Sequence, residues 1–259
     1  MDCVLRPVSH GWNCEAVLVY TIGLNGYIDR YDDYVRSQHE YAKRNGYAYL
    51  VVTEPSWKYG ASEASWLKIA VMNDALADGY DRVAYIDCDA EVLPFAPPID
   101  SVFGIDSRGD VFMARGHSGR FNAGVIFVRN SLLSRRFFEA IWNNIGTPLD
   151  PADDVGWGEN GHVIQAARRM GCVTEMPSSW NNTAWPPSRS EFIRHHTGQL
   201  QNAEENQTAQ AGTIVGPSVR SKPTADRLTT RPEDSALLIQ RTHLLAAEYS
   251  PRVPIPQRR

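Results

Sequence analysis

The sequence predicts an α/β protein built on a mostly parallel sheet that helices cover on both faces. Three β-rich runs alternate with two helical patterns within about 75 residues, and parallel neighbours need such crossover connections. The third run, residues 82–86, has an apolar core without polar alternation, as in a strand buried on both faces. With 259 residues and 42% hydrophobic content, the chain can bury one good core.

The first elements alternate as such a fold requires. Residues 16–22 form a β-rich run that ends at Gly23, and apolar residues at helical spacing follow from 28 to 42. An Asn-Gly pair ends that helix, and residues 47–53 form the second run. A second helix is expected over about residues 62–78, with one apolar stripe. Ligands of such sheets bind beyond the carboxyl ends of the strands.

The second half of the predicted domain contains two more strands and two more helices. Residues 111–114 and 125–128 are β-rich. A helix is expected from about 132 to 144, and another from about 159 to 169.

The composition changes near residue 199. Residues 1–198 are expected to form the main domain, 199–232 a polar, flexible linker, and 233–259 a C-terminal helix and tail. The apolar positions of the last segment predict a short amphipathic helix, which either folds back on the domain or binds a partner.

Charge and cysteine usage exclude several classes of protein. The net charge of -4 argues against a nucleic-acid binder. The four cysteines have no Cys-x-x-Cys spacing, so reduced thiols in the cytoplasm are expected. The sequence shows no secretory signal and no apolar window of the ~20 residues of a membrane span, so a soluble protein is expected. Asn181-Asn182-Thr183 matches the glycosylation pattern, which is common by chance.

Asp87-Cys88-Asp89 follows the third β-rich run directly. In an extended backbone the two carboxylates point to one side and Cys88 to the other, toward the core. Two carboxylates at the end of a strand can hold a divalent cation, and that cation would bind a diphosphate. The alternative is a helix cap or a surface charge. Residues 90–94 are expected to form a turn out of the sheet.

Four local patterns stand in chain order: Trp66-Leu67-Lys68, Tyr85-Ile86-Asp87-Cys88-Asp89, Phe121-Asn122-Ala123-Gly124-Val125 and His195-His196-Thr197-Gly198. Together they resemble a GT-A glycosyltransferase over about residues 15 to 198. The order is similar to the retaining families that include glycogenin-like enzymes and galactosyl- and xylosyltransferases. The resemblance implies a GT-A (Rossmann-like) fold, with a central mixed, mostly parallel sheet flanked by helices on both faces.

The resemblance also implies a metal site and a donor site. Asp87 and Asp89 would hold Mn²⁺ (or Mg²⁺) and the diphosphate of a nucleotide sugar, with His195 completing the metal site and His196 in reserve. Manganese accepts mixed carboxylate and imidazole ligands, whereas magnesium prefers oxygen. Lys68 resembles the family's basic donor contact, although a helical lysine is as often a solvated surface charge.

Two patterns are placed against the sugar by the same resemblance. Asn122-Ala123-Gly124 resembles a turn in which glycine allows close backbone approach. Glu159-Asn160 occupies the place of an acidic-Gln pair, with Asn in place of Gln. The Lys-Pro-Trp of the family is missing after Gly198, so a diphosphate contact is lost or supplied elsewhere.

The implied reaction moves a sugar from a nucleoside-diphosphate sugar to a hydroxyl of a sugar or glycan acceptor, with retention of configuration. An inverting enzyme would need a carboxylate base, for which Asp153, Asp154 and Glu159 are candidates by position. Trp157, Trp180 and Trp185 are candidates for sugar stacking or for ordinary packing. The predicted site comprises catalytic residues (Asn122, Glu159, Asn160, Asp154), donor-binding residues (Thr21, Lys68, Asp87, Cys88, Asp89, Ala123, Gly124, Gly198) and metal ligands (Asp87, Asp89, His195).

Two other functions are compatible with an acidic pair. A metal-dependent phosphohydrolase or nucleotidyltransferase also holds divalent ions on a phosphate, but it usually needs more acidic ligands to bind two metals. The third possibility is a non-catalytic nucleotide-sugar binder or scaffold that acts through the tail.

Overall fold

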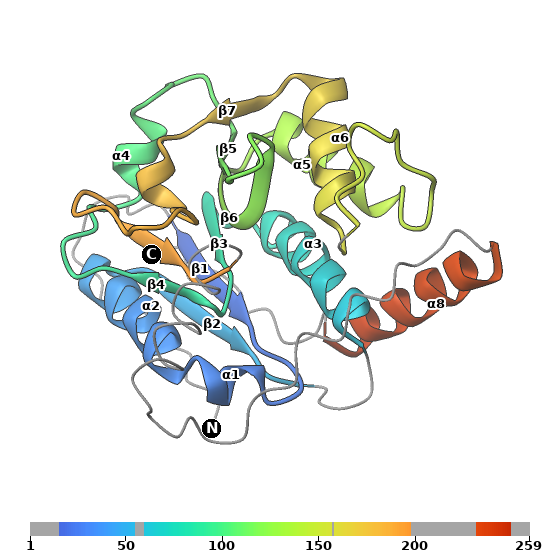
Figure 1. Cartoon of the computed structure of the whole chain (residues 1–259), viewed down its shortest axis with the longest axis horizontal. Helices are drawn as coiled ribbons and strands as arrows, with labels where there is room; N and C mark the ends of the chain where they lie inside the picture. Colours follow the sequence, from blue (N-terminus) through green and yellow to red (C-terminus); the bar gives the residue numbers. More distant parts are fainter. Residues whose placement is uncertain (1–15, 55–59, 157, 198–231, 250–259) are drawn as a thin grey trace.

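A six-stranded mixed sheet forms the centre of the computed structural model, which describes residues 16–54, 60–156, 158–197 and 232–249 (Figure 1). The strand order is β2-β1-β3-β6-β5-β7. The strands are β1 (Val17–Ile22), β2 (Ala48–Val52), β3 (Arg82–Ile86), β5 (Val111–Arg115), β6 (Phe121–Arg129) and β7 (Val173–Glu175). Only β6 runs against its neighbours, β3 and β5. The expectation of a mixed, mostly parallel sheet is therefore confirmed.

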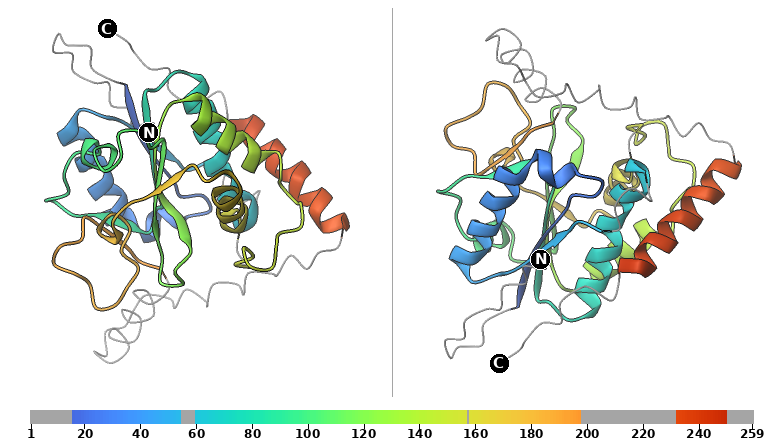
Figure 2. Two further views of the ribbon diagram at one scale, coloured as in Figure 1. Left: turned by 90° about the horizontal axis from the view of Figure 1, so that it is seen from above. Right: turned by 90° about the horizontal axis from the view of Figure 1, so that it is seen from below.

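Helices cover both faces of this sheet, as Figure 2 shows with the sheet seen near its edge. One face carries α2 (Asp32–Asn45) and α4 (Asp100–Phe103). The other carries α3 (Ala61–Ala77), α5 (Leu132–Trp142) and α6 (Asn160–Met170). Side chains of β1 alternate between the two cores: Val17 and Val19 face α2, and Leu18 and Tyr20 face α3. Both apolar layers are thus built from a single set of strands, which explains their unbroken hydrophobic runs.

Several local predictions differ from the structure. The first predicted helix is interrupted at Tyr31, which has non-helical dihedrals and separates α1 (Tyr27–Arg30) from α2. The predicted turn at residues 90–94 begins instead as strand β4 (Ala90–Val92), because its partner β8 (Ile193–His195) lies about a hundred residues further along the chain. Asn122-Ala123-Gly124 belongs to β6 rather than to a turn before it.

Helix α3 is buried on nearly its whole circumference, whereas the sequence predicted a single apolar stripe. The difference comes from α8 (Pro232–Tyr249), which packs along α3 and buries Leu245 in the same core. Arg241 of α8 also pairs with Glu63 of α3, with an Nε–Oε1 distance of 2.5 Å. The C-terminal helix therefore folds back on the domain, and it begins at the last residue of the predicted linker. Within the described ranges, none of the helices has the length and apolar character to cross a bilayer.

Candidate metal and donor site

Asp87, Cys88 and Asp89 form a tight turn immediately after β3. Ala90 N–H donates to the carbonyl of Asp87 at 3.0 Å, so the segment is not extended as the sequence argument assumed. Asp87 and Asp89 nevertheless converge with His195, and one ligand atom from each lies within 4.8 Å of the others. Cys88 points into the core on the α2 side, as expected, and burial raises the pKa of its thiol. A donor contact from Cys88 would therefore come from its backbone.

His195 is presented to the acidic pair by the small antiparallel ladder of β4 and β8. Ala90 pairs with His195 in this ladder. His195 Nε2 lies 3.2 Å from Asp89 Oδ1 and 3.5 Å from Asp87 Oδ2. His196 faces away from the pair: its ring stacks on Tyr34, with centroids 4.2 Å apart. Of the two candidate histidines, the structure places His195 at the acidic pair.

Gly124 lies opposite Asp87. Strands β3 and β6 are antiparallel and Ile86 pairs with Val125, so the residue after Ile86 lies opposite the residue before Val125. Asp87 N–H donates to the carbonyl of Gly124 at 2.7 Å. A Cβ on Gly124 would lie 2.1 Å from His195 Cε1 and 2.7 Å from Asp87 Oδ2. Glycine is therefore required here by the close approach of the two predicted metal ligands.

Lys68 joins the acidic turn to two of the other predicted patterns. Its Nζ lies 2.8 Å from Glu159 Oε1 and 3.4 Å from Asp87 Oδ1, and it donates to the carbonyl of Ala123 at 3.3 Å. The side chain is buried, so the interpretation as a solvated surface charge is wrong. Burial alone would lower the pKa of Lys68, but the carboxylates of Asp87 and Glu159 outweigh it and raise this pKa.

The residues at the start of α6 contact both Lys68 and the backbone of β6. Glu159 is the N-cap residue of α6 and is buried against Lys68. Asn160 Oδ1 accepts a hydrogen bond from Ala123 N–H at 2.9 Å, which fixes the backbone of β6. Asp154 is exposed, and its Oδ1 accepts from Gly156 N–H at 2.7 Å. Asp153 is held by Arg168, which lowers the pKa of this carboxyl.

Two other predicted residues, Thr21 and Trp180, are buried. Thr21 lies inside β1 and is fully buried, so a donor contact would require neighbouring side chains to move. Trp180 packs in the core against Phe127, which excludes it as an exposed sugar platform. Gly198 and Trp157 lie outside the described residues.

Sequence reasoning missed several residues that orient the acidic turn. Tyr27 O–H donates to Asp89 Oδ2 at 3.3 Å, and Tyr85 O–H donates to Asp87 Oδ1. Gln38 of α2 donates to the carbonyls of Asp87 and Ala90, at 2.9 and 2.8 Å. Asn181 Oδ1 lies 2.9 Å from His195 Nδ1. Of these residues, only Tyr85 belonged to one of the four sequence patterns, because it lies in the strand that leads into the acidic turn.

The chemistry of this site fits a divalent cation. The ammonium of Lys68 lies 3.4 Å from Asp87 and 2.8 Å from Glu159, and the carboxylate of Asp89 lies next to that of Asp87 at His195 Nε2. A further cation would stabilise this concentration of negative charge in a largely buried site. Two carboxylates and an imidazole form a ligand set that suits manganese better than magnesium.

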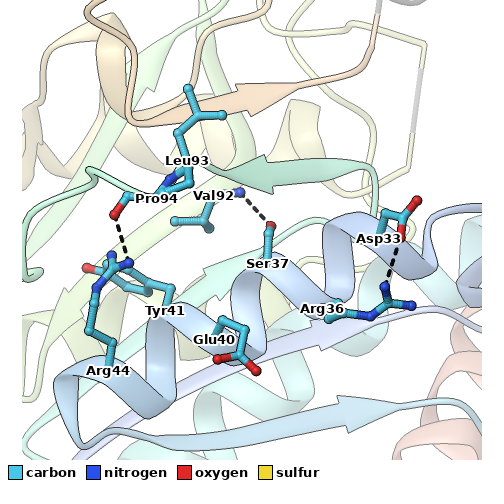
Figure 3. Close-up of a pocket in the computed structure, with 9 residues that line it drawn as sticks. All are labelled: Asp33, Arg36, Ser37, Glu40, Tyr41, Arg44, Val92, Leu93 and Pro94. Carbon is cyan, nitrogen blue, oxygen red and sulfur yellow. Dashed lines mark hydrogen bonds and ion pairs between the residues drawn. The ribbon is translucent and has the colours of Figure 1, made fainter.

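A groove of about 290 Å³ between α2 and residues 92–94 is separate from this site (Figure 3). Its cations are already paired: Arg44 donates to the carbonyls of Pro94 and Ala96, and Arg36 lies 3.2 Å from Asp33. The groove contains none of the predicted site residues. It is therefore not the donor site that the sequence predicts.

The mixed sheet and the acidic turn at its carboxyl edge define the GT-A class of glycosyltransferase folds. No protein-family model and no curated protein matches the sequence. Among solved structures, a glycosyltransferase involved in the glycosylation of the major capsid of PBCV-1 matches with a TM-score of 0.59 and 13% identity, covering 75% of this chain and 99% of that one. This match shows a shared fold.

Two further solved structures match with lower scores. The galactosyltransferase LgtC, in complex with donor and acceptor sugar analogues, has a TM-score of 0.46 and 12% identity, covering 78% of this chain and 98% of that one. A Drosophila β1,4-galactosyltransferase 7 mutant, in complex with manganese, UDP-Gal and xylobiose, has a TM-score of 0.40 and 16% identity, covering 72% and 73%.

Proposed function

We propose that this protein is a metal-dependent glycosyltransferase that moves a sugar from a nucleoside-diphosphate sugar to a hydroxyl of a sugar or glycan acceptor. The observation that carries the proposal is the convergence of Asp87, Asp89 and His195 at the carboxyl edge of a GT-A sheet. That edge is where open α/β sheets bind their ligands. The donor site would lie over Asp87, Gly124 and the elements next to them.

Each group of the site has a defined part in this reaction. Asp87, Asp89 and His195 would hold Mn²⁺ or Mg²⁺, which when bound neutralises the charge on the departing diphosphate. The bond from the anomeric carbon to the diphosphate oxygen breaks, and a bond from that carbon to the acceptor oxygen forms. Lys68 holds Asp87 and Glu159 in place and offsets their charge. Gly124 leaves room for the ligands to approach.

We include retention of configuration in this proposal. An inverting transfer needs a carboxylate base aligned with the acceptor hydroxyl. Of the three candidates, Asp153 is bound to Arg168 and Glu159 to Lys68, while Asp154 is exposed and caps a turn. Because the three carboxylates already make these contacts, we favour attack from the face that the diphosphate leaves. The acceptor proton then passes to the departing phosphate oxygen.

The remaining parts of the proposal concern the chain as a whole. Residues 1–198 would carry the transferase, and α8 would stabilise it by packing on α3. Cys88 and Cys172 are free thiols, which suits a reducing compartment, and we propose the cytoplasm.

Hydrolysis of nucleotide sugars in the presence of Mn²⁺ tests the proposal. A panel of nucleoside-diphosphate sugars is incubated with the wild-type protein and with Asp89→Asn, and free sugar is measured. We expect slow, manganese-dependent hydrolysis that falls by at least about 100-fold in Asp89→Asn, because a direct ligand matters at least as much as the outer partners of a metal. Asp33→Asn, which removes an exposed carboxylate of α2, is the matched control and should retain activity.

The same assay separates the other two functions. Release of phosphate from simple phosphoesters, with no turnover of nucleotide sugars, would favour a phosphohydrolase. Manganese-dependent binding of a nucleotide sugar without turnover, even with acceptors present, would favour a non-catalytic binder.

A further inference from the structure

Asn181 connects two parts of the site that are far apart in the sequence. It follows the 3₁₀ turn η1 (Ser178–Trp180) and is buried, with 1% of its surface exposed. One end of its carboxamide lies 2.9 Å from His195 Nδ1. The other end lies 3.1 Å from Asn122 Oδ1 and 3.3 Å from the carbonyl oxygen of Asn122.

The surrounding hydrogen bonds fix the orientation of this carboxamide. Gly124 N–H donates to Asn122 Oδ1 at 2.8 Å, so this atom of Asn122 must be the amide oxygen. Asn122 therefore offers two acceptors to Asn181, and only the NH₂ group of Asn181 can face them. The oxygen of Asn181 must then face His195, and the usual ambiguity of an amide is removed.

The orientation of Asn181 determines the tautomer of His195. An amide oxygen only accepts hydrogen bonds, so His195 Nδ1 must carry the proton and donate it. In the neutral ring, Nε2 then has a free lone pair. That lone pair points to where Asp89 Oδ1 lies at 3.2 Å and Asp87 Oδ2 at 3.5 Å. A neutral ring therefore leaves three acceptor atoms facing one another, an arrangement that a metal ion between them would stabilise.

We infer that Asn181 is a positioning residue: its carboxamide fixes the Nδ1–H tautomer of His195, which presents the Nε2 lone pair to the metal. The inference rests on the proposed metal site and adds a residue to it. A metal-ligating histidine commonly donates its other ring N–H to an oxygen acceptor, and here that acceptor is an amide rather than a carboxylate. Because the same amide binds Asn122, the orientation of His195 is tied to the strand that carries Gly124.

The tautomer can be read directly in the metal-free protein. Long-range ¹H–¹⁵N correlation spectra of the histidine rings distinguish protonated from unprotonated ring nitrogens, and His195→Gln assigns the signals. Under mildly alkaline conditions we expect Nδ1 to be protonated and Nε2 unprotonated in the wild-type protein. A ring protonated at Nε2, alone or together with Nδ1, would overturn the inference.

Two neighbouring variants test the effect on the metal. Asn181→Ala should lower the affinity for Mn²⁺ alone, measured by electron paramagnetic resonance of the free ion, by about 10- to 100-fold, and it should mix the tautomers. Asn182→Ala is the matched control, because the Asn182 side chain binds Glu191 and Ala184 in the same loop and not His195. Asn182→Ala should preserve both the tautomer of His195 and the Mn²⁺ affinity, even if the loss of its own hydrogen bonds lowers the melting temperature.

The outcomes separate this inference from the proposed function. Equal losses of Mn²⁺ affinity in the two variants, at an unchanged tautomer, would mean that Asn181 acts only on the structure of the loop and would refute the positioning role. If Asn181→Ala does not fold, the wild-type tautomer still decides. A wild-type protein with the expected tautomer that binds no Mn²⁺, with or without inorganic pyrophosphate, would contradict the proposed metal site and leave the tautomer assignment standing.

Discussion

At the residue scale, the site leaves no space for a side chain at Gly124. A methyl group on Gly124 would occupy the space of His195 and of Asp87 Oδ2. In Gly124→Ala we expect the affinity for Mn²⁺ to fall at least about tenfold, since these two residues must separate. The overpacking should cost about 1–3 kcal/mol of the free energy of unfolding. Titration with Mn²⁺ and urea unfolding measure the two effects.

Gly104→Ala is the control for this substitution. Gly104 has φ -73°, which any residue can adopt. The atom nearest to an added Cβ would be the carbonyl oxygen of Ser101, at an ordinary contact distance of 3.5 Å. Both quantities should stay close to the wild-type values. An unchanged Mn²⁺ affinity in Gly124→Ala would show that His195 and Asp87 do not close on one ion.

The sequence was informative for residues that lie next to a strong local pattern. Asp87 and Asp89 follow a predicted strand directly. His195 and Lys68 were identified through the patterns of the family resemblance, and the fold brings both of them to the acidic pair. Asn181 matched only a glycosylation pattern of no weight, and Gln38 matched none. Both act through hydrogen bonds to residues of other elements, and such contacts leave no periodic signal.

At the scale of elements, α8 should contribute to stability through its inner face. Leu245 is fully buried against α3, whereas its neighbour Leu244 is about half exposed. Leu245→Ala should therefore lower the free energy of unfolding by about 2–5 kcal/mol. Leu244→Ala removes the same atoms from the outer face and should change it by no more than about 0.5 kcal/mol. Urea unfolding compares the two variants. Equal effects would mean that α8 does not pack on the domain in solution.

An ion pair between Asp153, in the loop before α6, and Arg168 should make the stability of the fold depend on pH. Arg168 holds the pKa of Asp153 below its usual range, so this pair stabilises the fold above the ordinary aspartate pKa of about 4. The contribution is lost as the pH falls through the lowered pKa. Asp153→Asn should be less stable than wild type near neutral pH, and the two unfolding curves should converge in acid. Asp154→Asn, at the exposed neighbouring carboxyl, should follow the wild-type curve throughout. A constant difference between Asp153→Asn and wild type at all pH values would argue against the ion pair.

Elements with their own hydrophobic period were predicted well, and elements defined by a distant partner were not. The strands β1, β2 and β3 and the helices α3 and α5 lie close to their predicted ranges. Strand β4 was read as a turn because only its pairing with β8 makes it a strand. The full burial of α3 likewise depends on α8, which is encoded more than 150 residues later.

At the scale of the whole molecule, ligand binding should appear as thermal stability. A ligand that binds only the folded chain at about 100 times its Kd adds about 2.7 kcal/mol to the free energy of unfolding. For a chain of this size, each kcal/mol raises Tm by about 2–4 °C, so the matching nucleotide sugar should raise it by roughly 5–10 °C. We expect this shift with Mn²⁺, a smaller one with Mg²⁺, and none after chelation with EDTA. Differential scanning fluorimetry of a panel of nucleotide sugars measures it.

The identity of the stabilising ligand then tests the site as a unit. The shift should disappear in Asp89→Asn and persist in Asp33→Asn, because only the first substitution removes a proposed ligand of the metal. A nucleoside monophosphate, which lacks the diphosphate, should stabilise the protein less than the corresponding diphosphate sugar. If no nucleotide sugar raises Tm, with or without Mn²⁺, the fold would be that of a GT-A enzyme without its donor site. If instead the shift survives in Asp89→Asn, the ligand binds somewhere other than the acidic turn.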